Sequence, residues 1–266
     1  MLKPIKIVSY LIEYLLLRLL QVLLAIIPRR TALSLGALCG SLLYHLGVYR
    51  RIVRVNLNHV GAWDDAAMKR ITRSLYRNIG KYAVDFLRPA YPLPPHEIHD
   101  FDILEPLLAR GKGTIAILGH LGNWEILSTV FGKRTGRLHV VAKPMNNTIV
   151  DKWLLAKRTA SSVKTIYTSS ALRKMIEVLR ADGIIAILID QYAKSHGTAA
   201  PFLGREANTV RTVAGLAVKT GCSVDTGVPW RTSTASISRH VSTRESNTAF
   251  AKAWRASSRA HRGNTS

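Results

Sequence analysis

The feature that most constrains this fold is a regular alternation of short apolar runs with amphipathic segments between residues 114 and 219. The run IIAILI at 184–189 has the length and the branched side chains of a buried strand. Strands that alternate with helices favour an α/β domain with a mostly parallel sheet. Functional side chains of such sheets lie on loops at the carboxyl ends of strands. The expected strands are 114–118, 138–142, 165–167 and 184–189, and the expected helices are 124–131, 147–159, 171–180 and 209–219.

The N-terminal segment VSYLIEYLLLRLLQVLLAII, residues 8–27, is long and apolar. About 20 residues suffice to span a bilayer as a helix, but Glu13, Arg18 and Gln21 interrupt this one. Its polar side chains share one arc of about 140° on a helical wheel. The helix therefore either spans with this stripe packed on protein or lies in the membrane interface. A buried core helix is the structural alternative, and a secretory signal is disfavoured because no small-residue cleavage site follows.

Two further segments lie between this helix and the expected sheet. Residues 32–48 are apolar and contain three glycines, so they are either a membrane-dipping partner of the first helix or ordinary core. Residues 62–87 carry apolar side chains at three- and four-residue steps, which predicts an amphipathic helix. The proline-rich stretch 89–95 ends it. We expect a membrane-associated helical region at 1–48, an α/β domain at 49–224 and an atypical tail at 225–266.

The charge of the chain points to an anionic partner. The formal net charge is +22 over 266 residues, which suits nucleic acid, an anionic membrane or an acidic protein or substrate. Part of that charge lies in residues 231–266, which are rich in Ser, Thr, Arg and Ala and lack apolar periodicity. The two cysteines match no metal-ligand spacing. We therefore predict no metal site and no cofactor.

The stretch AILGHLGNWEI, residues 116–126, carries the candidate chemistry. His120 follows a predicted strand end, and an imidazole can take a proton from a hydroxyl as a general base. Glu125 is expected to reach back across the turn and hold the other ring nitrogen. Asn123 is expected to cap the next helix and leave N–H groups that favour a nearby anion. No serine or cysteine adjoins His120, so a substrate hydroxyl would attack directly. The alternative is a structural loop histidine.

Several blocks, in order along the chain, resemble one family. GHLGNWE is similar to the H-x4-D/E block of glycerolipid acyltransferases, in the form found in the late acyltransferases of bacterial lipid A biosynthesis, the lauroyl and myristoyl transferases. The resemblance covers roughly residues 5–224, and the blocks together are specific although each alone is not. The further matching blocks are YRRIVRVNLNHV (49–60), KPMNNTIVDKW (143–153), Lys157-Arg158, ILIDQ (187–191), PFLGR (201–205) and GLAVKTG (215–221).

The resemblance implies a fold, a reaction and roles for single residues. The fold would be the glycerolipid acyltransferase-like α/β sandwich with an N-terminal membrane-anchoring helix, on the cytoplasmic side of the inner membrane. The reaction would move a fatty acyl chain from acyl carrier protein to a hydroxyl of a lipid A precursor. His120 would be the general base and Glu125 its orienting partner. Arg158, and more weakly Lys143, would bind a phosphate. Asp190 and Gln191 would shape the site.

The charge agrees with these partners, because acyl carrier protein is acidic and lipid A precursors are phosphorylated. The same chemistry on another glycolipid acceptor, such as a phosphatidylinositol mannoside, stays open because the motifs do not identify the acceptor. A basic membrane or nucleic-acid binder without enzymatic activity is the third alternative. No nucleic-acid-binding signature supports it, so no nucleic-acid partner is expected.

The C-terminal part departs from the family pattern. Members of the family continue beyond the block at 215–221 with another strand, more sheet and a helix rich in Trp and His. Here the sequence SVDTGVPWRTSTAS follows instead. Two interpretations of residues 225–266 stay open, a disordered tail or the product of a frameshift near codon 224.

Overall fold

The computed structural model describes residues 4–88, 96–98, 105–106, 108–120, 122–191, 193, 197–202, 205–225, 230–232 and 235–237. The chain forms two compact units, Met1–Pro92 and Leu93–Ser266. The helices Arg50–Val60 and Asp65–Leu87 thus belong to the same unit as the N-terminal helix. The domain boundary after residue 48 that the sequence suggested stays a prediction, and the two compact units divide after Pro92 instead.

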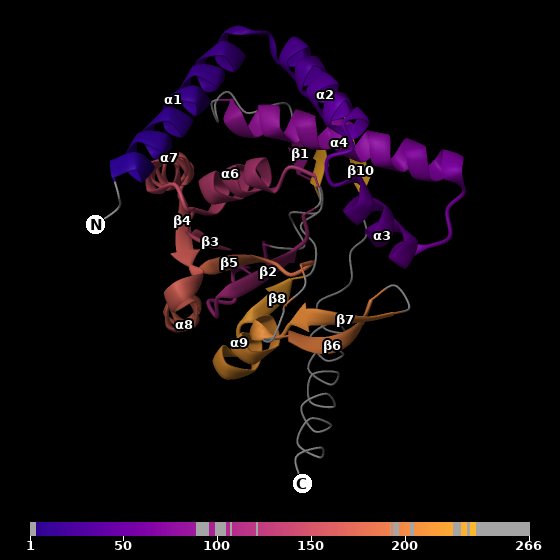
Figure 1. Cartoon of the computed structure of the whole chain (residues 1–266). Coiled ribbons are helices and arrows are strands. Elements are labelled where there is room, and N and C mark those ends of the chain that lie inside the picture. The colour runs from indigo at the N-terminus through magenta and orange to yellow at the C-terminus, as the bar shows by residue number, and fades with distance from the viewer. Residues whose placement is uncertain are drawn as a thin grey trace. The chain divides into compact units, whose positions relative to one another are not determined.

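The first unit consists of helices in its described part: α1 (Pro4–Ile26), α2 (Arg29–His45), α3 (Arg50–Val60) and α4 (Asp65–Leu87) (Figure 1). The apolar helix α1 is long and apolar enough over Lys6–Ile26 to cross a membrane. Pro28 separates α1 from α2, as expected for a residue that lacks a backbone N–H. The Asp64 side chain caps α4 by accepting a 2.6 Å hydrogen bond from the Ala67 N–H.

Helices α2 and α4 pack closely because glycines meet at their contact. A Cβ atom on Gly80 would overlap the carbonyl group of Gly36, and a Cβ on Gly40 would overlap the carbonyl group of Tyr76. Arg29 at the start of α2 adds a two-pronged ion pair to Asp85 of α4, with N···O distances of 2.8 and 3.0 Å. The two helices therefore form one rigid pair.

The second unit is built on a five-stranded parallel sheet of order β4-β3-β5-β2-β8, which confirms the predicted fold class. Its helices lie on both faces, α6 and α7 on one and α8 and α9 on the other (Figure 1). The strands are β2 (Thr114–Leu118), β3 (Leu138–Ala142), β4 (Val163–Tyr167), β5 (Ile184–Leu188) and β8 (Ser223–Asp225), and the helices are α6 (Trp124–Thr135), α7 (Thr148–Thr159), α8 (Ala171–Arg180) and α9 (Thr212–Thr220).

The side chains of the central strands alternate between two hydrophobic cores. Ile185 and Ile187 of β5 join the core that includes Leu179 of α8 and Leu216 of α9. Ile184 and Ala186 of the same strand join the core that includes Leu127 and Phe131 of α6. A strand buried on both faces reads as a continuous apolar run, which explains the sequence IIAIL.

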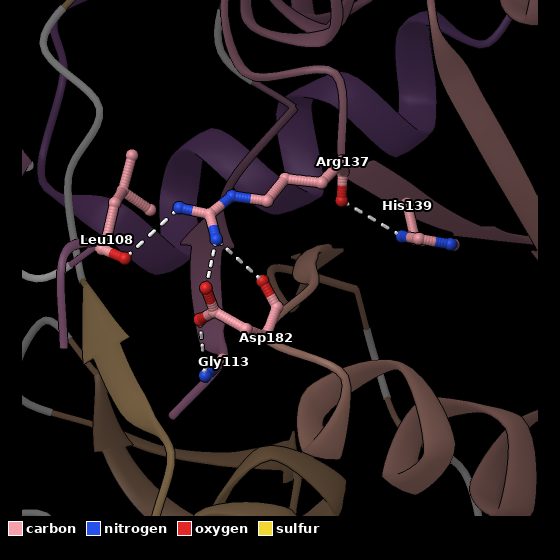
Figure 2. A network of polar contacts seen from close by, with 5 residues as sticks. All are labelled: Leu108, Gly113, Arg137, His139 and Asp182. Atoms are coloured by element: carbon pink, nitrogen blue, oxygen red, sulfur yellow. Dashed lines mark hydrogen bonds and ion pairs between the residues drawn. The ribbon is translucent and has the colours of Figure 1, made fainter. Parts of the chain in front are cut away.

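A polar network fastens the amino ends of the strands (Figure 2). The Arg137 guanidinium, just before β3, pairs with the Asp182 carboxylate just before β5, and it donates to the Leu108 carbonyl oxygen at 3.1 Å. The second Asp182 oxygen accepts the Gly113 N–H at 3.0 Å, just before β2. The network therefore ties three neighbouring strands together at the edge opposite to their carboxyl ends.

Two stretches differ from the sequence prediction. Residues 209–210, expected at the start of a helix, end the strand β7 (Arg205–Val210), which forms an antiparallel hairpin with β6 (Gly197–Phe202). Within the predicted tail, β9 (Trp230–Thr232) and β10 (Ala235–Ile237) pair with each other, and β9 also pairs with β1 (His96–Ile98). The short strand β8 also includes Asp225, the first residue of that tail. Residues 238–266 lie outside the described part.

Candidate functional site

The register of the parallel sheet brings two of the predicted site residues together. Strand β2 pairs with β5 so that Leu118 lies opposite Leu188. His120 and Asp190 each follow two residues after this pair. Both residues thus lie just beyond the carboxyl ends of β2 and β5, at the edge of the sheet where the sequence predicted the site. The juxtaposition therefore follows from strand order and register.

Asp190 holds His120 through both of its carboxylate oxygens. Oδ1 lies 2.7 Å from the ring Nδ1, and Oδ2 accepts the His120 backbone N–H at 2.6 Å. Because a carboxylate oxygen accepts, the ring proton belongs on Nδ1 and leaves Nε2 as an acceptor. The Gln191 amide nitrogen is 3.5 Å from Nε2, a weak contact. The Trp124 ring and the imidazole pack in a T-shaped arrangement, with ring centroids 4.8 Å apart.

The carboxylate partner of His120 is not the predicted one. Glu125 lies in the first turn of α6 and pairs with Arg158 in the last turn of α7, where the guanidinium donates through both Nε and Nη2. Both side chains are largely buried, at 19% and 14% exposure. Asp190, and not Glu125, thus makes the contact with the His120 ring. Glu125 and Arg158 form a second charged pair that joins two helices.

Asn123 caps helix α6 as predicted. Its Oδ1 accepts the Ile126 N–H at 3.2 Å. The side chain is buried, and its amide Nδ2 has no hydrogen-bond partner within the described part of the chain. A buried donor without a partner is uncommon in folded proteins. It is the kind of group that a bound substrate oxygen satisfies.

The loop after β3 is fixed by Asp151 of α7. One Asp151 oxygen accepts the Met145 N–H at 3.0 Å, and the other accepts the Tyr167 hydroxyl at 2.6 Å. The hydrogen bond to Asp151 raises the pKa of the Tyr167 phenol. Lys143 lies exposed at the start of this loop. Sequence reasoning did not single out Asp151 or Tyr167, although Asp151 stands within the matching block at 143–153.

Lys157, beside Arg158, is a further residue whose environment the sequence did not reveal. Burial lowers the pKa of Lys157 to about 8, and the negative charge of Glu125 opposes that shift. The Lys157 ammonium lies 5.6 Å from the centroid of the Trp153 ring. Glu125, Lys157 and Arg158 therefore form one group of one anion and two cations.

The chemistry available here is that of an imidazole positioned by a carboxylate. Among the described residues, no group of three or more His, Cys, Asp or Glu side chains is arranged to hold a metal ion. His120 is exposed at the carboxyl edge of the sheet and is held in one tautomer. It can accept a proton from an incoming hydroxyl through Nε2.

A comparison with protein families identifies one match that covers nearly the whole chain. Residues 2–251 match the family described as bacterial lipid A biosynthesis acyltransferase. The matched range continues beyond residue 224, where the resemblance recognised in the sequence ended. No curated protein matches the chain.

Proposed function

Because this chain belongs to the bacterial lipid A biosynthesis acyltransferase family, we propose that it transfers a fatty acyl chain from acyl carrier protein to a hydroxyl of a lipid A precursor. Family membership makes the protein an acyltransferase of lipid A biosynthesis. The donor, the acceptor and the roles of single residues are our proposal. The observation that carries the catalytic part is the carboxylate of Asp190 on the backbone and ring of His120.

In the proposed reaction, His120 Nε2 takes the proton of the acceptor hydroxyl while its oxygen attacks the thioester carbonyl carbon. The new C–O bond forms a tetrahedral intermediate, which collapses with cleavage of the C–S bond. The imidazolium then returns its proton to the leaving sulfur. Asp190 holds the ring in the required tautomer and stabilises the imidazolium, as carboxylates do in other acid–base pairs. No covalent enzyme intermediate is needed.

Asn123 is our candidate for the group that stabilises the negative oxygen of that intermediate. Its buried Nδ2 lacks a partner among the described residues, and it stands at the N-terminus of α6, where backbone N–H groups and the helix dipole favour negative charge. Donors of this kind contribute about 10²–10³-fold to kcat in acyl-transfer enzymes.

We assign the cations near the site to the phosphates of donor and acceptor. Arg158 donates two N–H groups to Glu125. Because a guanidinium has five N–H groups, Arg158 can bind a carboxylate and a phosphate at once. Lys143 is exposed and can follow a mobile phosphate. In this proposal Glu125 orients Arg158, and Gln191 contacts the acceptor hydroxyl next to His120.

We also propose that the protein resides at the inner membrane with its catalytic unit in the cytoplasm. The support is the apolar helix α1, together with the cytoplasmic location of acyl carrier protein. A span and an interfacial position of α1 both agree with this assignment.

The test is mass spectrometry of lipids after reaction with acyl carrier protein loaded with mixed fatty acids. Membranes with the wild-type protein should add one acyl mass to a lipid A precursor. His120→Ala should lower turnover by about 10²–10⁴-fold. His59→Ala, an exposed histidine on α3, is the matched control and should retain activity.

Equal turnover by wild type and His120→Ala would remove His120 from the mechanism. Acylation of a different glycolipid would keep the base and change the acceptor. Acyl transfer from small thioesters with no preference for acyl carrier protein would withdraw the donor assignment.

A further inference from the structure

The outer face of α2 carries a row of leucines that no other described element covers. Leu38, Leu42 and Leu46 are 64%, 59% and 67% exposed. With Leu35, they recur at steps of three and four residues, so they lie on one side of the helix. We call these four residues the leucine face. A row of this size on a water-soluble surface is unusual and marks a contact with a partner or a membrane.

The opposite side of α2 is the one packed on α4. Its small residues, among them Gly36 and Gly40, lie so close to the α4 backbone that an added Cβ atom would overlap it. Helix α4 exposes Arg70, Ser74 and Arg77, and Arg77 also donates to Ser41 Oγ of α2 at 3.3 Å. The α2–α4 pair thus combines an apolar face on α2 with exposed arginines on α4.

The α2–α4 pair does not fit across a bilayer. The arginines of α4 would have to enter hydrocarbon together with α2, at a high cost. Helix α2 has 17 residues, or about 25 Å, less than the roughly 30 Å of a hydrocarbon core. A helix with one apolar side and a polar backing lies in the interface, with the apolar side about 5–10 Å into the boundary with the acyl chains.

Helix α3 supplies charge complementary to lipid head groups. It leaves α2 at a bend of 91° and exposes Ile52 and Val55 together with Arg51 and Arg54. Basic residues beside apolar side chains are typical of segments that bind anionic membrane surfaces. A second copy of this strongly cationic chain would bring like charges together, which disfavours a protein partner of that kind.

We propose that α2 and α3 form a second membrane contact, separate from the anchor α1, on an anionic bilayer. The leucine face lies among the outer acyl chains with α2 parallel to the surface. Arg51 and Arg54 of α3 bind the phosphates of the lipid head groups. This contact concerns the first unit alone and holds whether or not the acyl-transfer reaction proposed above is correct.

The protein carries a natural probe for this contact. Cys39 is exposed at the border of the leucine face, and Cys222 is buried. In a Cys222→Ala background, a polarity-sensitive fluorophore on Cys39 is measured in full-length protein reconstituted into vesicles of phosphatidylglycerol and phosphatidylcholine. Nitroxides on the lipid acyl chains should quench it, and its emission should shift to the blue. The matched control is Cys39→Ser/Ser74→Cys, whose label at the exposed position 74 of α4 should be quenched by aqueous iodide instead.

The charge part of the proposal has its own variants. Quenching at Cys39 should be severalfold stronger with anionic than with neutral vesicles, and Arg51→Gln/Arg54→Gln should abolish that difference. Leu38→Glu/Leu42→Glu should expose the Cys39 label to water, whereas Ser74→Glu should leave the quenching of that label unchanged.

Equal iodide quenching of the labels at Cys39 and at position 74 would overturn the proposal. A blue-shifted Cys39 label that lipid nitroxides do not reach, and that depends on protein concentration, would replace the bilayer by a second copy of the chain. Neither result depends on acyl transfer, because no acyl donor is present.

Discussion

At the scale of single residues, Asp190 controls both what His120 can do and where it stands. One oxygen fixes the ring and the other fixes the backbone of the same residue. In the proposed mechanism, an imidazole held in this way loses little further freedom when the substrate arrives, which favours direct proton transfer. The contact is exposed enough for a substrate hydroxyl to reach Nε2 and displace the weak contact of Gln191.

The first prediction concerns Asp190→Asn, which keeps the shape of the side chain. The single amide oxygen of asparagine can accept either the backbone N–H or the ring Nδ1–H of His120. The amide NH₂ then faces the group that the oxygen does not accept. If the oxygen keeps the backbone N–H, the ring must turn to the Nε2–H tautomer and lose its acceptor. We expect kcat to fall about 10²–10⁴-fold with a small change in KM. Gln191→Ala, which leaves both contacts of Asp190 with His120 in place, is the comparison, and its kcat should fall less. An unchanged kcat for Asp190→Asn would contradict the proposed tautomer.

The second prediction concerns Asn123→Ser, which separates capping from catalysis. Serine also caps helices well, so the stability of the protein should change little. The substitution removes the unpartnered Nδ2 donor, so kcat should fall about 10²-fold. Steady-state kinetics and thermal melting of the same preparation check the two parts. A loss of stability without a loss of kcat would make Asn123 a cap alone.

The third prediction concerns pH and Lys157. Burial lowers the pKa of Lys157 from 10.5 to about 8 in the folded protein. Between these two values the unfolded chain binds more protons, so this group makes stability rise with pH. Lys157→Met removes the buried charge. Its gain in free energy of unfolding should be largest below pH 8 and should vanish above pH 10.5. Denaturant titrations at several pH values, with Lys152→Met on the same helix as control, measure the gain. A gain independent of pH would refute the assignment.

At the scale of elements, close packing of helices fixes the first unit. The contact of α2 with α4 depends on glycines at positions where any Cβ atom would meet backbone. Helix α9 of the second unit holds a glycine of the opposite kind, Gly215, whose added Cβ would meet nothing within 4 Å. The two positions allow a matched test.

The fourth prediction is that Gly80→Ala destabilises the protein and Gly215→Ala does not. The added methyl at residue 80 forces α2 and α4 apart, and overpacking costs about 1–3 kcal/mol. At residue 215 the same change gains helix propensity of up to about 1 kcal/mol. Thermal melting in detergent compares both with wild type. Equal melting temperatures for wild type and Gly80→Ala would show that the α2–α4 contact is looser than described.

The elements also show what the sequence could and could not reveal. The parallel sheet and its four main helices follow from apolar runs and periodicity, which are local signals. The strand β7 was missed because its sequence REANTV is polar and carries no apolar alternation. The partner of His120 was missed for a different reason. Sequence spacing favours Glu125, whereas Asp190 is 70 residues away and becomes a neighbour only through the pairing of β2 with β5.

At the scale of the whole molecule, the net charge of +22 governs encounters with partners. Long-range attraction between a cationic protein and an acidic partner raises association rates and is screened by salt. The family match that continues to residue 251 includes part of the basic C-terminal stretch. Resequencing around codon 224 tests the frameshift interpretation, and an intact reading frame there would rule it out.

The fifth prediction therefore concerns ionic strength. The apparent KM for acyl carrier protein should rise about tenfold between 50 and 300 mM NaCl, because screening weakens electrostatic steering. A small acyl thioester without the carrier protein is the control, and its KM should change much less. Equal salt dependence for both donors would show that the cationic surface does not recruit the carrier protein.

The pairing of Leu118 with Leu188 limits which changes in the gene can preserve the contact between His120 and Asp190. His120 and Asp190 meet because each stands two residues beyond that pair. The addition or loss of one codon between Leu118 and His120, or between Leu188 and Asp190, would move one of the two side chains out of reach of the other while leaving the sheet intact. At residues 119 and 189, therefore, substitutions can preserve the contact of His120 with Asp190, whereas insertions and deletions cannot.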